Sequence, residues 1–141
     1  MLSKFVRIAF AALLALGLLA CAGPPVDRDT PSGRPERTIR GTTPSKVQGA
    51  ITNELINMGY QPRARSDQRA VFEKRDGATG ILRMIFELVE VDNSVRVIGT
   101  YLAINNPGTS GEFVFPYHNS QENGKPLRDV LDKVRAALDK P

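Results

Sequence analysis

Residues 81–104 read ILRMIFELVEVDNSVRVIGTYLAI and contain the two longest strands that the sequence predicts. Asp92 and Asn93 are typical of a two-residue turn, so the stretch is expected to fold back on itself as an antiparallel hairpin. Val91 then lies opposite Ser94. Because side chains alternate between the two sides of a strand, this single pairing assigns every residue of the hairpin to one face of the sheet.

The hairpin register predicts one uncharged face and one mixed face. The uncharged face comprises Leu82, Met84, Phe86, Leu88, Val97, Gly99, Tyr101 and Ala103. We expect helices to pack on this face, where Gly99 would allow a close approach. The mixed face carries the aliphatic residues Ile81, Ile85, Val89, Ile98, Leu102 and Ile104, interrupted by Arg83, Glu87, Arg96 and Thr100.

The aliphatic residues of the mixed face admit more than one interpretation. Large exposed apolar patches usually mark binding surfaces, so Ile81, Ile85, Val89, Ile98 and Leu102 form a candidate surface for a protein partner. The alternatives are that these residues serve strand propensity alone, that the stems of neighbouring charged residues cover them, or that a different register buries this face.

Two segments have the spacing of amphipathic helices. The first follows Thr43, a typical N-cap, with Pro44 at the first helical position, and Gly59 would end it in the left-handed conformation. The second begins at Pro126. The two apolar stripes are Val47, Ile51, Leu55 and Met58, and Leu127, Val130, Leu131, Val134 and Leu138.

Shorter segments complete the expected order of elements. Strands are predicted at residues 70–74 and where Phe113, Phe115 and Tyr117 alternate, and a weakly predicted edge strand covers residues 37–40. The order is (β)-α-β-β-β-β-α. It predicts an α+β protein with an antiparallel four- to five-stranded sheet and two helices packed on one face.

The N-terminus has the pattern of a signal peptide. Lys4 and Arg7 precede an apolar run, residues 8–20, that is shorter than the roughly 20 residues a membrane-spanning helix needs. The sequence therefore predicts a signal peptide at residues 1–20, then Cys21 with a disordered Pro-rich tether at residues 21–35.

The residues Leu18-Leu19-Ala20-Cys21 resemble the lipobox of bacterial lipoproteins. The resemblance implies that the signal is removed and that acyl chains such as palmitate are attached to Cys21, which anchors the protein to the membrane. Since Ala22 is not the aspartate that typically retains lipoproteins at the inner membrane, the periplasmic face of the outer membrane is the expected location. The alternatives are an ordinary secreted protein and an uncleaved anchor.

The remaining residues 36–141 are expected to form one α+β domain. The order of its elements is similar to the helix-grip, or TBP-like, arrangement of the BamC family of envelope lipoproteins. The resemblance covers element order only. It implies an accessory role in envelope assembly and assigns no site residue.

Charge does not indicate a nucleic-acid partner. Lys4 and Arg7 belong to the predicted signal, so 17 of the 19 basic residues remain in the mature chain against 15 acidic ones. This balance is only weakly basic, aromatic residues for base stacking are few, and the periplasm does not normally contain nucleic acid.

Catalytic residues are scarce in this sequence. His118 is the only histidine and is interpreted as an ordinary residue of a loop or strand end, and Cys21 is assigned to lipid attachment. Ser110 and Ser120 lack the Gly-x-Ser-x-Gly context of a nucleophile. We expect no enzyme, no cofactor and no metal site.

A basic cluster is the second candidate site. Arg63, Arg65 and Arg69, with Lys74 and Arg75 nearby, are offset only by Asp67 and Glu73. Guanidinium groups bind phosphate and carboxylate, so the three arginines could bind an anionic lipid headgroup, lipopolysaccharide or peptidoglycan. The alternative is a solvated loop. The sequence thus predicts a non-enzymatic accessory or scaffold lipoprotein that docks on another envelope protein, with an anion-binding module as the other candidate.

Overall fold

The structure, a computed structural model, describes residues 28–139 of the 141-residue chain. The predicted signal peptide, Cys21 and residues 22–27 of the predicted tether lie outside this range. The elements in chain order are β1 (Arg28–Asp29), β2 (Pro35–Arg40), α2 (Pro44–Asn57), β3 (Gln61–Ser66), β4 (Arg69–Asp76), β5 (Gly80–Val91), β6 (Ser94–Asn105), β7 (Phe113–Pro116), the 3₁₀ helix η2 (Tyr117–Asn119) and α3 (Lys125–Leu138).

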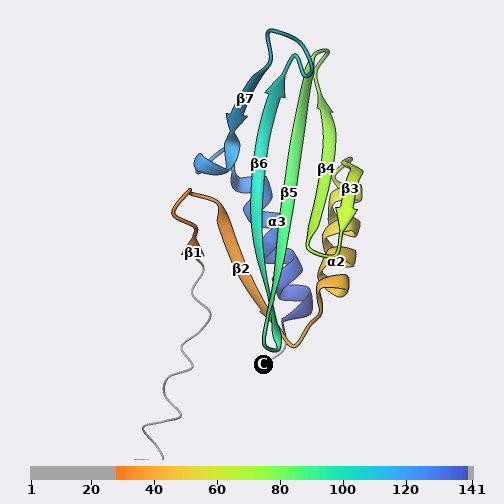
Figure 1. The fold of residues 1–141 in the computed structure, drawn as a ribbon, viewed down its shortest axis with the longest axis vertical. Coiled ribbons are helices and arrows are strands. Elements are labelled where there is room, and N and C mark those ends of the chain that lie inside the picture. Colours follow the sequence, from red (N-terminus) through yellow and green to blue (C-terminus); the bar gives the residue numbers. More distant parts are fainter. Residues whose placement is uncertain (1–27, 140–141) are drawn as a thin grey trace, which may run out of the picture.

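The strands within the described range form one antiparallel sheet in the order β1-β2-β6-β5-β4-β3, with β7 also paired to β6. β2 pairs with the first half of β6 and β7 with its last residues, so both strands lie along the same edge of β6 (Figure 1). The hairpin of β5 and β6 has the predicted register, with Val91 opposite Ser94.

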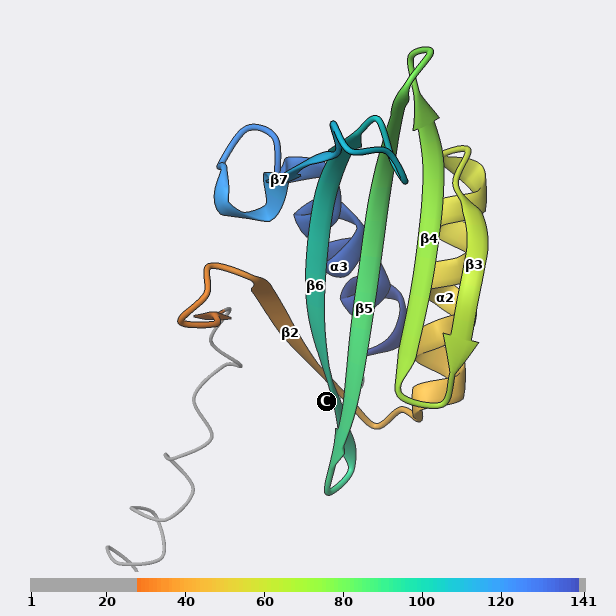
Figure 2. The same ribbon diagram turned by 45° about the horizontal axis from the view of Figure 1, so that its top comes forward.

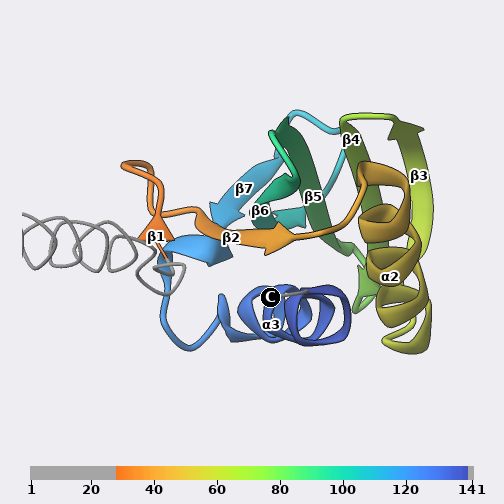
Figure 3. The ribbon, with the colours of Figure 1, turned by 90° about the horizontal axis from the view of Figure 1, so that it is seen from below.

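Both helices lie on one face of the sheet, and the sheet curves around them (Figure 3). α3 packs beneath β2 and β6, and α2 lies beside β3 at the other side of the sheet (Figure 2). No helix of the described residues covers the opposite face. The predicted α+β class, with an antiparallel sheet, two helices on one face and the expected order of elements, is therefore confirmed.

The ends of α2 follow from its sequence. Thr43 occupies the N-cap position and Pro44 begins the helix, where its missing N–H costs nothing. Gly59 has a φ of 85°, a left-handed conformation that a side chain would strain. The backbone N–H of Tyr60 donates to the carbonyl of Leu55 at 2.9 Å, which returns the chain toward the core.

The core lies between the helices and the predicted uncharged face of the hairpin. Met84 and Phe86 of β5 are fully buried, as is Leu127 of α3. A Cβ placed on Gly99 would lie only 2.8 Å from Cδ1 of Leu127, so the glycine allows α3 to approach the sheet as expected. One charged side chain also lies on this side: Arg37 of β2 is buried, and its Nε donates to Asp132 of α3 at 2.6 Å.

The sequence did not reveal every strand. Residues 61–66 were interpreted as part of a basic segment, but they form β3, which pairs with β4 at the edge of the sheet. All six residues of β3 are exposed, so this strand has none of the apolar alternation by which strands are recognised. Its pairing with β4 is irregular between Pro62 and Ala64.

The two ends of the domain also differ from expectation. Residues 28–35, assigned to the tether, form β1, a turn and the first residue of β2, so the ordered chain begins before residue 36. The fourth predicted strand is shorter than its aromatic alternation indicated. β7 ends at Pro116, and Tyr117 belongs to η2. The Tyr117 ring packs edge to face against the Tyr101 ring, with the ring centroids 5.6 Å apart.

Candidate functional site

We call the sheet face that carries no helix the open face. Register places the following residues of β4, β5 and β6 on it: Arg69, Val71, Glu73 and Arg75; Ile81, Arg83, Ile85, Glu87, Val89 and Val91; Ser94, Arg96, Ile98, Thr100, Leu102 and Ile104. Across the strands these residues form rows. One row is wholly uncharged, with Val71 and Thr100 on either side of Ile85.

The two carboxylates in the middle of the open face are paired within the chain. Glu73 accepts hydrogen bonds from Arg63 at 3.0 Å and from Arg83 at 2.7 Å. Glu87 accepts one from Arg34, which precedes β2, at 2.7 Å. These pairs leave the apolar rows as the part of the face without a specific partner among the described residues.

The structure brings the predicted partner surface together on the open face. Ile81, Ile85, Ile98 and Leu102 are partly exposed, and Val89 is 39% exposed. Ile104 had been assigned to the same face and lies there. It is nevertheless buried, with Ile81 on one neighbouring strand and Val114 on the other.

β7 adds exposed apolar side chains beside this surface. Val114 continues the row of Ile81 and Ile104 on the open face, while Phe113 and Phe115 point to the helix side of the sheet. Phe113 is 64% exposed. The sequence predicted this strand but gave no reason to expect its side chains to be solvent-accessible.

The predicted arginine cluster is not assembled into one site. Arg63 lies on the open face and pairs with Glu73, and Arg69 lies on that face opposite Glu87. Arg65 lies on the helix side, where its Nε donates to the side-chain oxygen of Gln48 in α2 at 2.6 Å. Regular alternation would place Arg63 and Arg65 on the same face, but the pairing of β3 with β4 is irregular between Pro62 and Ala64. This irregularity moves Arg65 to the helix side, opposite Ala70.

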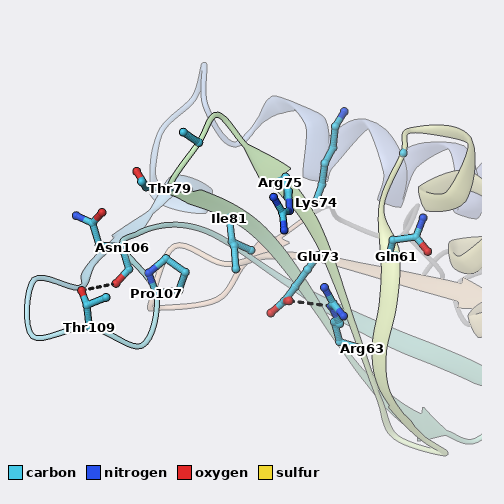
Figure 4. Close-up of a pocket in the computed structure, with 13 residues that line it drawn as sticks. Gln61, Arg63, Glu73, Lys74, Arg75, Thr79, Ile81, Asn106, Pro107 and Thr109 are labelled. Carbon is cyan, nitrogen blue, oxygen red and sulfur yellow. Dashed lines mark hydrogen bonds and ion pairs between the residues drawn. The ribbon is translucent and has the colours of Figure 1, made fainter.

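A groove lies at the end of the open face where β4 extends beyond Gln61, the first residue of β3 (Figure 4). Its volume is about 780 Å³. The lining comes from four places: the start of β3, the end of β4, the β4–β5 turn with Ile81, and the loop after β6. Figure 4 shows Arg75 and Ile81 near each other, with Asn106, Pro107 and Thr109 on one side of them.

Sequence reasoning assigned most groove residues to other roles. Thr79 lies in the β4–β5 turn, and Asn106 and Pro107 lie in the loop after β6. Ile81 belongs to the predicted partner surface, and Arg63 and Arg75 to the predicted basic cluster and its surroundings. The turn and the loop are distant in sequence and meet because β5 and β6 are the same length, so no local pattern could have joined them.

The side chains of His118, Tyr60 and Tyr101 have structural partners. Nδ1 of His118 lies 3.0 Å from the carbonyl oxygen of Tyr101 and 3.3 Å from its backbone nitrogen. The hydroxyl groups of Tyr60 and Tyr101 are 3.2 Å apart, and burial raises the pKa of both phenols. Within residues 28–139 no group of three potential metal ligands occurs, and no helix is long and apolar enough to cross a membrane.

Comparison with known proteins gives no family assignment. No protein-family model matches the chain, and a search of curated proteins finds no significant match.

Proposed function

We propose that this chain is a lipid-anchored protein of the bacterial envelope that docks on another envelope protein through the open face. The anchor would be Cys21, on the strength of the motif Leu18-Leu19-Ala20-Cys21, and the location would be the periplasmic face of the outer membrane. The proposed role is that of an accessory or scaffold protein without catalysis. His118, the only histidine of the chain, is held by the backbone of Tyr101.

One observation carries the docking proposal: the open face has aliphatic side chains that no helix covers, and the carboxylates Glu73 and Glu87 beside them are already paired. A partner that covers Ile85 and Leu102 would remove apolar surface from water, which is favourable by about 25 cal/mol per Å². Glu73 would remain bound to Arg63 and Arg83 during docking. The cost of desolvating an unpaired carboxylate would thus be avoided.

Ile85 is the most informative position at which to test docking. Its cross-strand neighbours are Val71 and Thr100, so a new charge there would find no opposite charge directly beside it. Ile98 is less suitable for a glutamate because it lies between Glu36 and Glu87, which would repel the new carboxylate even without a partner. Ile56 on α2 provides a matched control, since it is 52% exposed and lies in the helix layer.

The experiment is cross-linking in cells that express the full chain, followed by detergent extraction and quantification of the attached protein. Ile85→Glu should abolish recovery of the cross-linked partner, while Ile56→Glu should leave it unchanged. Circular dichroism of both variants would establish that they are folded. Equal recovery from wild type and Ile85→Glu would show that the open face is not the docking surface.

A further inference from the structure

We propose that the groove beside Arg75 binds a phosphate or carboxylate group carried on a sugar-sized body. This site goes beyond docking through the open face and differs from the predicted cluster of Arg63, Arg65 and Arg69. Its centre is the part of β4 that extends past β3. β3 begins at Gln61, opposite Glu73, so the residues of β4 that follow Glu73 have no strand beside them on that side.

Charge makes the groove selective for anions. Three cationic side chains line it, Arg63, Lys74 and Arg75, against the single carboxylate of Glu73. That carboxylate lies within 3.0 Å of Arg63 and 2.6 Å of Arg83, so both of these guanidinium groups already compete for it. Glu73 is therefore not available to neutralise Arg75.

Arg75 is the cation in the groove that lacks a protein partner. It is exposed and lies opposite Ile81 of β5. Its guanidinium makes no hydrogen bond or ion pair with residues 28–139. The group carries five N–H donors in a planar arrangement suited to phosphate or carboxylate. An anion entering the groove would meet this group without having to displace a carboxylate from it.

Lys74 lines the groove from the other side of β4. It is opposite Leu82 on the helix side, whereas Arg75 is opposite Ile81 on the open face (Figure 4). The Lys74 ammonium donates to the carbonyl of Met58 at the end of α2 at 2.9 Å and lies 5.8 Å from the centre of the Tyr60 ring. The proposed anion contact on the open face therefore depends on Arg75.

The opposite wall of the groove is formed by a loop with a defined conformation. The backbone N–H of Asn106 donates to the carbonyl of Thr79 at 2.9 Å, which ties the loop to the β4–β5 turn. The hydroxyl of Thr109 donates to the carbonyl of Asn106 at 2.8 Å. A wall that is ordered before binding lowers the entropic cost of holding a ligand.

The non-ionic lining indicates what would carry the anion. Ile81 and Pro107 present apolar surface, while the side chains of Gln61, Thr79 and Asn106 offer hydrogen-bonding groups. A sugar ring has a weakly polar face and a rim of hydroxyl groups, which suits such a mixture. The volume of about 780 Å³ is within the range of ordinary small-molecule sites, roughly 300–1,000 Å³.

The test is an NMR titration of the full chain in a neutral detergent, observed through its backbone amides. Glucose 1-phosphate represents the phosphate of a lipid or glycan, glucuronic acid represents a carboxylate, and glucose is the uncharged control. We expect shifts at Arg75, Ile81 and Asn106 with one or both anions and none with glucose. The anion that binds more tightly identifies which of the two groups the groove prefers.

Two variants of the same strand separate a site from general electrostatic attraction. Arg75→Gln should weaken binding of the preferred anion at least about tenfold, the effect of losing charge-assisted hydrogen bonds. Arg69→Gln removes the same charge from the other end of β4 and should change the affinity less than about twofold. Equal weakening by both variants, or no shift of the groove amides with either anion, would overturn the proposal.

Discussion

The two faces of this sheet are formed by the same strands but differ in how deeply their side chains are buried. On the helix side of β5, Met84 and Phe86 are fully buried. On the open side of the same strand, Ile85 remains partly exposed although it is as apolar as its neighbours. The difference arises because α2 and α3 cover only one face. The apolar character of a strand residue therefore does not by itself identify the core.

Charge distinguishes the faces more sharply than hydrophobicity. Ion pairs on the open face, such as Glu73 with Arg63 and Arg83, connect neighbouring strands to one another. On the helix side, Arg37 pairs with Asp132 and connects the sheet to α3. Charge thus joins the layers on one face, while on the other it pairs side chains within a surface that no helix of the described residues covers.

Removing a large side chain from the covered face should have the largest effect on stability. Phe86→Ala deletes a fully buried ring that packs edge to face with Phe72 at a centroid distance of 6.2 Å. We expect the free energy of unfolding to fall by about 3–5 kcal/mol, because the transfer free energy is lost and a cavity remains. Urea denaturation of the full chain measures this change.

Ile85, which is adjacent to Phe86 but lies on the open face, is the control position for that measurement. Ile85→Ala removes apolar atoms from the adjacent position of β5 and should cost about 1 kcal/mol or less, since its side chain is only partly buried. Comparable losses for Phe86→Ala and Ile85→Ala would show that the open face is packed like a core, which would contradict the contrast between the two faces.

The sequence predicted the parts of the fold that depend on short-range patterns. The turn at Asp92 and Asn93 set the register of β5 and β6, and the N-cap Thr43 with Pro44 located the start of α2. β3 escaped prediction because its side chains are all exposed. A strand stabilised mainly by pairing with β4 leaves no apolar alternation in its sequence.

The candidate sites were predicted less completely than the fold. The five residues of the partner surface were located correctly on one face because hairpin register alone determines their side. Arg63, Arg65 and Arg69 are close in sequence, but the irregular pairing of the unrecognised strand β3 places Arg65 on the helix side, away from the other two. The groove forms where Thr79 contacts Asn106. These residues flank the two ends of the β5–β6 hairpin and are far apart in sequence, so no local motif predicts their contact.

A substitution at Gly99 tests how closely α3 must approach the sheet. We expect its effect on stability to be smaller than that of Phe86→Ala. Gly99→Ala would place a Cβ 2.8 Å from Cδ1 of Leu127, so the fully buried Leu127 side chain would have to shift against its neighbours. We expect a loss of about 1–3 kcal/mol in the free energy of unfolding from overpacking.

A double-mutant cycle identifies the cause of that loss. Leu127→Ala alone should be destabilising because it leaves a cavity, but in that background the added methyl group of Gly99→Ala fills part of the space. The two changes together should therefore cost less than the sum of the single changes. Additive losses would indicate that Gly99 matters for backbone conformation and not for the approach of α3.

The ion pair at the C-terminal end of α3 should have the smallest effect and a defined dependence on pH. Asp139 accepts a hydrogen bond from the backbone N–H of Arg40 at 2.6 Å and pairs with its guanidinium at 3.0 Å, and these contacts lower the pKa of the Asp139 carboxyl. A carboxyl whose pKa is lower in the folded state contributes stability above its unfolded pKa of about 3.9 and loses it as pH falls through the folded value. Asp139→Asn should therefore lower the melting temperature slightly at neutral pH, and the difference from wild type should shrink below about pH 4. A difference that stays constant down to the most acidic condition would mean that the charge of Asp139 does not contribute to the attachment of α3 to β2.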